Sequence, residues 1–134
     1  MQTVVVIPVV CAIIENNAKI LCAQRSSSMS LALKWEFPGG KIEDYEDPEV
    51  ALIREIEEEL GIVVSIKKAL NPSEYSYSPG KVVRLIPFIC EVENAEQVVA
   101  KEHSQIRWLS KDKMSELDWA AADIPIVEEY IRLK

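Results

Sequence analysis

The segment from Asp47 to Gly61 limits the fold most strongly, because it carries both the start and the stop signal of a helix. Asp47 suits the N-cap, Pro48 suits the first helical position, and Gly61 suits the left-handed residue that ends a helix. The spacing predicts a helix of about three to four turns. The apolar residues expected on its core face are Val50, Ile53, Ile56 and Leu60.

Segments with strand character lie on both sides of this helix. They cover residues 4–14, 19–25, 62–70, 74–78, 81–92 and 104–110, and a second helical pattern covers residues 124–133. Turn signals at residues 15–17 and 79–80 join two pairs of these strands. Interleaved strands and helices predict an α/β fold with a mixed β-sheet between helices, and a length of 134 residues predicts a single domain over residues 1–134.

Charge and cysteine content narrow the class of protein. A net charge of −7 argues against binding of polymeric DNA or RNA, which requires a basic face. Cys11, Cys22 and Cys90 match neither a zinc site nor a redox pair, so we expect reduced core thiols in a cytoplasmic protein. The apolar residues 4–14 follow no basic residue and are too short to span a bilayer. We therefore expect no membrane partner. We also expect the chain to be a monomer or a weak homodimer.

Three carboxylates lie on one face of the predicted helix. Glu55, Glu58 and Glu59 stand at positions i, i+3 and i+4, and Arg54 can offset only part of their mutual repulsion. Such a cluster is either a solvated acidic face or a site for a hard divalent cation such as Mg²⁺, which proteins share with substrate phosphates. The preceding run of residues 37–40 favours the cation site, because its two final glycines let backbone carbonyls approach an ion.

The spacing of nine residues around this cluster resembles the signature of the Nudix hydrolase family, G-x5-E-x7-R-E-U-x-E-E-x-G-U, in which U is aliphatic. The fixed positions are Gly40, Glu46, Arg54, Glu55, Ile56, Glu58, Glu59, Gly61 and Ile62. No position departs from the pattern, and a match at so many positions is highly specific. The resemblance implies the Nudix fold and hydrolysis of a phosphoanhydride bond.

The resemblance also implies a role for each matching residue. Three glutamates bind or orient the catalytic Mg²⁺ and the attacking water, namely Glu55, Glu58 and Glu59. Mn²⁺ is the alternative ion. Arg54 holds these glutamates in place, and Glu46 supports the junction between loop and helix. A backbone carbonyl of Gly39 or Gly40 adds a further metal ligand.

Residues 35–43, with the sequence WEFPGGKIE, resemble the MutT-type members of this family, which hydrolyse nucleoside triphosphates to the monophosphate and pyrophosphate. By the same resemblance, Arg25 and Lys41 contact the phosphates, and the alternative for Arg25 is a solvated strand end. The aromatic residues that either stack on the base or belong to the core are Trp35, Phe37 and Trp119. Of these, we expect Phe37 to contact the substrate.

Two acidic residues outside the helix complete the predicted site. Glu102 precedes the last strand as a metal-reaching residue does in MutT-type enzymes, so it is either a fourth carboxylate ligand or an exposed loop charge. The resemblance to MutT-type members implies that Asp123 reads the base, and the alternative is that it caps the final helix. A carboxylate there accepts hydrogen bonds and suits the amino group of cytosine or the N–H edge of guanine. His103, the single histidine, is interpreted as structural.

Taken together, the resemblance implies a Mg²⁺-dependent pyrophosphohydrolase that acts on a small nucleoside triphosphate. Residues 122–130, ADIPIVEEY, resemble CTP pyrophosphohydrolase-like members and favour CTP, dCTP or modified cytidine nucleotides. One alternative is an 8-oxo-dGTP diphosphatase that clears oxidised precursors of DNA from the nucleotide pool. An alternative of another class is a non-catalytic domain that senses a nucleotide, which the intact set of glutamates disfavours.

Overall fold

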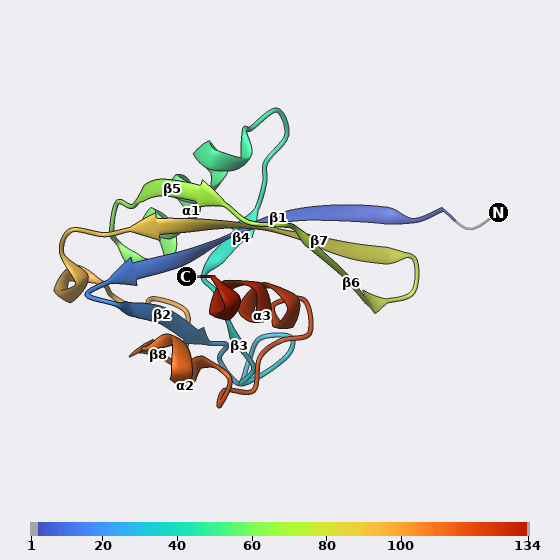
Figure 1. Ribbon diagram of the computed structural model, residues 1–134. Helices are drawn as coiled ribbons and strands as arrows, with labels where there is room; N and C mark the ends of the chain where they lie inside the picture. The colour runs from blue at the N-terminus through green and yellow to red at the C-terminus, as the bar shows by residue number, and fades with distance from the viewer. Residues whose placement is uncertain (1–2, 134) are drawn as a thin grey trace.

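The computed structural model describes residues 3–133, which form an eight-stranded mixed sheet with helices on both faces (Figure 1). The strands are β1 (Val5–Asn16), β2 (Lys19–Gln24), β3 (Trp35–Glu36), β4 (Gly39–Lys41), β5 (Ser65–Ala69), β6 (Ser73–Ser78), β7 (Lys81–Glu91) and β8 (Gln105–Leu109). The helices are α1 (Pro48–Leu60), α2 (Lys111–Met114), α3 (Ile124–Arg132) and a short 3₁₀ helix, η1 (Ala95–Gln97). The predicted α/β fold is confirmed, whereas residues 1, 2 and 134 of the predicted domain lie outside the described residues.

β1 is the central strand of the sheet. It runs parallel to β7 from Val5 to Glu15 and antiparallel to β2 and β4. The strand order is β3-β2-β1-β7-β5, with β8 paired to β2 and β6 paired to β7. Asn17 and Ala18 form the turn between β1 and β2 with positive φ values of 50° and 62°, so the predicted hairpin is confirmed.

Side chains of β1 alternate between two hydrophobic layers, because successive residues of a strand point to opposite faces of a sheet. Val10, Ala12 and Ile14 are buried together with apolar residues of α1. Cys11 and Ile13 are buried together with apolar residues of α3 on the other face. The layering therefore holds α1 and its acidic residues against one side of the sheet, while α3 covers the other side (Figure 1).

Helix α1 begins and ends where the sequence predicts. Pro48 is its first residue, Leu60 is its last, and Gly61 follows in the left-handed conformation with a φ of 70°. Asp47 occupies the N-cap position, but its side chain makes no capping hydrogen bond. Its backbone carbonyl accepts the N–H of Ala51 at 2.9 Å, so only the position of the cap was predicted correctly.

The buried face of α1 differs in part from the predicted one. Ile56 and Leu60 are fully buried as expected, but Val50 and Ile53 are 56% and 38% exposed. At about 100° per residue, a stripe centred between Leu52 and Ile56 leaves Ile53 at its margin and Val50 on the opposite side of the helix. The residues of this helix that are buried are Ala51, Leu52, Ile56 and Leu60.

The three cysteines are core thiols. Cys11, Cys22 and Cys90 are buried and free of disulfide bonds, as predicted. Burial raises the pKa of Cys22 and of Cys90 to about 12, and it raises the pKa of the Cys11 thiol well above its usual value. These thiols therefore stay protonated and pack as small apolar side chains.

Within residues 3–133, no helix has the length and apolar character needed to cross a membrane.

Candidate active site

Arg54 joins the acidic residues of α1 to the loop before the helix. Its guanidinium contacts both carboxylate oxygens of Glu46 at 2.8 Å. Nη1 donates to Glu55 at 2.9 Å and to Glu58 at 3.4 Å. The hydrogen bonds with Arg54 lower the pKa of Glu46 to about 2 and raise that of the guanidinium. Arg54 therefore fixes the junction between loop and helix and contacts two of the three carboxylates of α1 that are predicted to bind metal.

Gly39 and Gly40 bring the backbone of β4 close to β1 and α1. A Cβ atom at Gly39 would lie 1.9 Å from the carbonyl oxygen of Val10, and one at Gly40 would lie 2.3 Å from the carboxyl carbon of Glu55. Both distances are far below van der Waals contact, so a side chain at Gly39 would collide with the backbone of β1, and a side chain at Gly40 would displace the carboxylate of Glu55. The close approach of this backbone to the acidic face of α1 is what the glycine pair predicts.

Glu59 lies beside the buried stripe of α1, because it follows Leu52 by about two helical turns. Its Oε2 atom is buried and has no hydrogen-bond partner among the described residues. Burial, followed by the negative charges of Glu36, Glu55 and Glu102, raises the pKa of Glu59 to about 8. A buried acceptor without a partner is unfavourable, and a bound cation would satisfy it.

A cavity of about 560 Å³ opens beside Glu59. The predicted site residues that line it are Arg25, Phe37, Gly39, Gly40, Lys41, Glu59 and Asp123. Glu55 is not among the lining residues but adjoins Gly40. Glu58 and Glu102 are exposed outside the cavity, although the charge of Glu102 acts on Glu59. The structure thus brings the predicted substrate contacts together with the glycine pair and with one of the four predicted carboxylate ligands, Glu59.

The predicted aromatic residues belong to the core, and one of them also faces the cavity. Trp35, Phe37 and Trp119 are each at most 6% exposed. Phe37 packs against Trp119 with ring centroids 4.8 Å apart, and it alone of the three lines the cavity. Lys41 is exposed at the same cavity, where its ammonium group could meet a phosphate.

Arg25 lies in the cavity wall and already has partners. Its Nη1 pairs with Glu36 at 2.8 Å, while Nε and Nη2 donate to the carbonyl and hydroxyl of Ser30 at 2.6 and 3.1 Å. With a side chain only 20% exposed, Arg25 is not a solvated strand end, and that alternative is wrong. Three of its five N–H groups are used in these bonds, which leaves two for a ligand.

Asp123 precedes α3, but its side chain does not cap this helix. Its backbone is already helical, whereas capping residues are usually extended, and Oδ2 accepts the backbone N–H of Phe37 at 3.0 Å instead. The capping alternative is therefore wrong. Burial raises the pKa of Asp123 to about 8, so the carboxyl can carry a proton in the neutral range and can then donate as well as accept. The sequence predicted only an acceptor.

A comparison with known protein families decides the assignment. The profile of the NUDIX domain matches residues 6–130 of this chain. The chain belongs to the Nudix family. The resemblance carried by the signature is thereby confirmed, and the protein is a Nudix hydrolase.

Relatives of this Nudix hydrolase cover nearly all of the chain. A protein named CTP pyrophosphohydrolase from Escherichia coli (strain K12) is 36% identical over 96% of this chain and 93% of the relative. An 8-oxo-dGTP diphosphatase from the same organism is 34% identical over 89% of this chain and 90% of the relative. The solution structure of the E. coli ORF135 protein gives a TM-score of 0.82 at 35% identity, over 96% of this chain and 90% of that one. The crystal structure of the MutT protein from Methanosarcina mazei Go1 superposes with a TM-score of 0.86 at 26% identity. The match covers 98% of this chain and 97% of that one.

Nudix hydrolases generally need divalent metal ions, and the donors of this chain fit such an ion. Glu55 and Glu59 supply the hard carboxylate oxygens that Mg²⁺ prefers, and Oε2 of Glu59 lacks any other partner among the described residues. Among residues 3–133, no group of three or more acidic, histidine or cysteine side chains is arranged to hold a metal ion.

Asp123→Asn is expected to change how the stability of this Nudix hydrolase depends on pH. The folded wild type keeps a proton on Asp123 up to about pH 8, while the unfolded chain releases it near the ordinary value of 3.8. The free energy of unfolding therefore falls as the pH rises between these values. Asparagine does not titrate, so the variant should gain stability relative to wild type across this range. Thermal unfolding of both proteins in EDTA from about pH 5 to about pH 9 measures the difference, and parallel curves would contradict it.

Glu36 and His103 lie outside the predicted set but are joined to it by hydrogen bonds. Glu36 lines the cavity and contacts both Arg25, at 2.8 Å, and His103, at 2.9 Å. A signal for Glu36 was present in the MutT-like stretch, since it directly precedes Phe37. The signal for His103 was weaker, because only its position after Glu102 connects it to the site.

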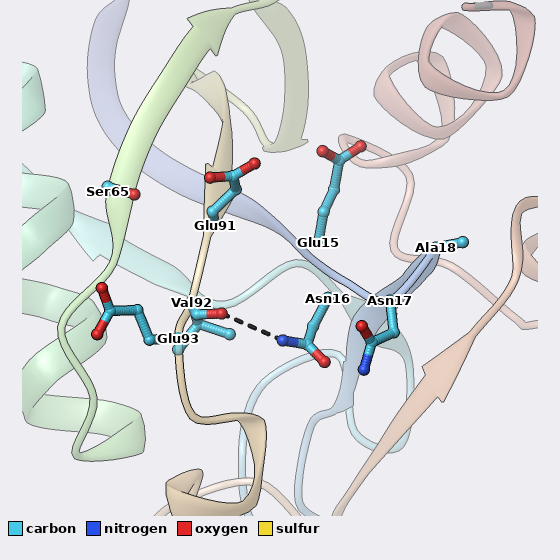
Figure 2. A pocket seen from close by; sticks show the side chains of 8 residues that line it. All are labelled: Glu15, Asn16, Asn17, Ala18, Ser65, Glu91, Val92 and Glu93. Carbon is cyan, nitrogen blue, oxygen red and sulfur yellow. Dashed lines mark hydrogen bonds between the residues drawn. The ribbon is translucent and has the colours of Figure 1, made fainter.

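A second cavity, of about 430 Å³, lies beyond the C-terminal ends of β1 and β7 (Figure 2). It is lined by Glu15, Glu91 and Glu93, and Asn16 donates to a backbone carbonyl beside them at 3.1 Å. Lys67 pairs with Glu15 and Glu91 at 3.2 and 3.1 Å, so these two carboxylates already have a cation. None of the predicted site residues lines this cavity.

Proposed function

We propose that this Nudix hydrolase converts a nucleoside triphosphate and water to the nucleoside monophosphate and pyrophosphate, with Mg²⁺ as cofactor. One observation carries the proposal, namely that a single cavity is lined by Glu59, whose Oε2 atom is buried, and by the bonded pair of Phe37 and Asp123. Its volume of about 560 Å³ suits a small molecule. Its acidic side suits a triphosphate that arrives with metal ions, because a cation reverses the local charge.

Each residue of the site has a role in the proposed reaction. The residues that would hold Mg²⁺ are Glu55, Glu58, Glu59, Glu102 and a backbone carbonyl of Gly39 or Gly40. When bound, Mg²⁺ neutralises phosphate charge and lowers the pKa of water. Arg54 keeps Glu55 and Glu58 in position, while Arg25 and Lys41 bind phosphate oxygens. Water attacks the β-phosphorus, the bond to the bridging oxygen of the α-phosphate breaks, and a glutamate takes the proton.

The nucleotides that we propose as substrates are CTP, dCTP or modified cytidine nucleotides. The name of the E. coli relative, CTP pyrophosphohydrolase, supports this preference. Asp123 supports it as well, because its carboxyl can accept a hydrogen bond from the amino group of cytosine in either protonation state.

A second candidate is an 8-oxo-dGTP diphosphatase that clears oxidised nucleotides. The raised pKa of Asp123 favours it, because a protonated carboxyl can donate to the O6 acceptor of guanine. The relative named 8-oxo-dGTP diphosphatase supports the same candidate.

Pyrophosphate release from a panel of nucleotides tests the proposal. The values of kcat/KM for CTP, dCTP, methylated dCTP, UTP, GTP and 8-oxo-dGTP are compared with Mg²⁺ and with EDTA. A Mg²⁺-dependent lead of the cytidine nucleotides over UTP, which lacks the amino group, supports the first candidate, and a lead of 8-oxo-dGTP supports the second. Tight binding without any release of pyrophosphate or phosphate would instead indicate a nucleotide sensor.

Asp123→Ala provides a further measurement on the same panel. If Asp123 reads the base, its loss should change the ranking of nucleotides more than the maximal rate. An equal loss on every nucleotide would contradict a role in base recognition.

A further inference from the structure

The side chain of His103 is buried and has one hydrogen-bond partner among the described residues. It is 1% exposed, Nε2 lies 2.9 Å from Oε2 of Glu36, and Nδ1 is buried without a partner among the described residues. A buried ring nitrogen without a partner is unfavourable, so an apolar side chain would suit the stability of the fold better at this position. Packing alone therefore does not account for the imidazole.

Glu36 is held from two sides at the wall of the cavity. Its Oε1 accepts Nη1 of Arg25 at 2.8 Å, and its Oε2 faces Nε2 of His103. Because both oxygens are engaged, the carboxylate has a fixed orientation, and each oxygen keeps a lone pair for another donor. Glu36 lines the cavity together with Asp123, so it presents fixed acceptor atoms to a molecule bound there.

The segment that carries His103 is fastened to the end of β2. The backbone N–H of Ser104 donates to the carbonyl of Gln24 at 2.9 Å, and its hydroxyl donates to the side chain of Gln24 at 2.8 Å. Gln24 directly precedes Arg25, the other partner of Glu36. On its other side, His103 follows Glu102, whose charge acts on Glu59. The loop therefore touches both the Arg25–Glu36 pair and the acidic side of the site.

We propose that His103 is a positioning residue that fixes Glu36 as a hydrogen-bond acceptor for the nucleotide and connects this acceptor to the loop of Glu102. The inference rests on the proposed function, since it takes a nucleotide as the occupant of the cavity. His103 acts through Glu36 and does not touch the substrate. The proposal assigns the ring hydrogen to Nε2, which then donates to Oε2 of Glu36.

The hydrogen on the imidazole can be observed without any assay of activity. His103 is the single histidine of the chain, so every imidazole signal in a ¹⁵N NMR spectrum of the protein belongs to it. We expect a hydrogen on Nε2 that exchanges slowly with solvent, and faster exchange in Glu36→Ala. An Nε2 without hydrogen, or a signal that Glu36→Ala leaves unchanged, would overturn the proposal.

A double-mutant cycle tests the functional part. His103→Leu removes the donor, whereas His103→Gln keeps an N–H near the position of Nε2. We expect His103→Leu to lower kcat/KM by about ten- to a hundredfold, mainly through a higher KM, and His103→Gln to stay within about threefold of wild type. In a Glu36→Ala background, His103→Leu should add almost no further loss, because the contact is already absent.

Ser104→Ala is the matched control, because it loosens the same loop without touching Glu36, and its kcat/KM should stay near that of wild type. The positioning role would be contradicted if His103→Leu lowered kcat/KM equally in the wild-type and Glu36→Ala backgrounds. A folded His103→Gln with no higher kcat/KM than His103→Leu would contradict it as well. If the wild type hydrolyses no nucleotide, the proposed function fails, and the NMR spectrum still decides whether His103 holds Glu36.

Discussion

Replacing Glu58 with glutamine is expected to lower kcat on nucleoside triphosphates by about a hundred- to a thousandfold while the thermal stability stays near that of wild type. Glutamine keeps the shape of the side chain but removes the charge that the proposed Mg²⁺ site uses. The side chain is 60% exposed and its contact with Arg54 is long, at 3.4 Å, so the folded structure depends little on it. Turnover at saturating nucleotide and Mg²⁺, together with thermal unfolding, measures both effects.

Glu57→Gln is the matched control for this prediction. Glu57 is exposed on the same helix, directly precedes Glu58, and occupies a position that the Nudix signature leaves free. We expect it to keep the turnover of wild type. Near-normal turnover in Glu58→Gln would make the assignment of this residue to the metal site wrong. Equal losses in both variants would point to the overall charge of the helix instead of a specific ligand.

Gly40→Ala is expected to lower turnover to a similar extent for a steric reason. The new Cβ would lie 2.3 Å from the carboxyl group of Glu55, so this carboxylate must leave its place. Its 2.9 Å contact with Arg54 would be disturbed at the same time. Because the displaced group is the end of a side chain, the fold should survive with a loss of about 1–3 kcal/mol in the free energy of unfolding.

Gly39→Ala separates the steric effect on the site from damage to the fold. Here the Cβ would lie 1.9 Å from the backbone oxygen of Val10 and 2.8 Å from the Cα of Cys11, and neither atom can move without moving β1. We therefore expect a much lower melting temperature for Gly39→Ala than for Gly40→Ala. Wild-type turnover in Gly40→Ala, or equal melting temperatures in the two variants, would contradict displacement of Glu55.

The parts of the fold that local signals determine were predictable from sequence. Pro48 and Gly61 mark the ends of α1 for local steric reasons. The ring of proline fixes its φ, and glycine adopts a left-handed φ because it has no Cβ. Helical spacing predicts Val50 and Ile53 on the core face, whereas both are exposed, because the spacing defines a stripe but not which edge of it the sheet covers.

Parts of the site that depend on distant contacts were not predictable. The side chain of Asp123 bonds to Phe37, which is 86 positions away in the chain, and this contact replaces the local cap that the sequence allowed. His103 and Glu36 are 67 positions apart. They meet because β8 pairs with β2 and β2 pairs with β3, and no spacing in the sequence encodes that order.

The signature itself fixed more of the site than the rest of the chain. Within residues 40–62, the spacing predicted both the acidic face and the arginine that contacts it, because a helix converts spacing directly into position. The burial of Glu59 could not be read in the same way. It depends on how far α1 is rotated toward the sheet, which only the packed structure reveals.

Hydrolysis of the best nucleotide substrate in ¹⁸O-labelled water, with Mg²⁺ and with EDTA, tests the central claim most directly. Separation of the products followed by ³¹P NMR identifies both the products and the phosphorus that water attacked. We expect equal amounts of nucleoside monophosphate and pyrophosphate, ¹⁸O in the pyrophosphate, and no reaction in EDTA. Release of nucleoside diphosphate and phosphate, or hydrolysis that persists in EDTA, would contradict a metal-dependent attack on the β-phosphorus.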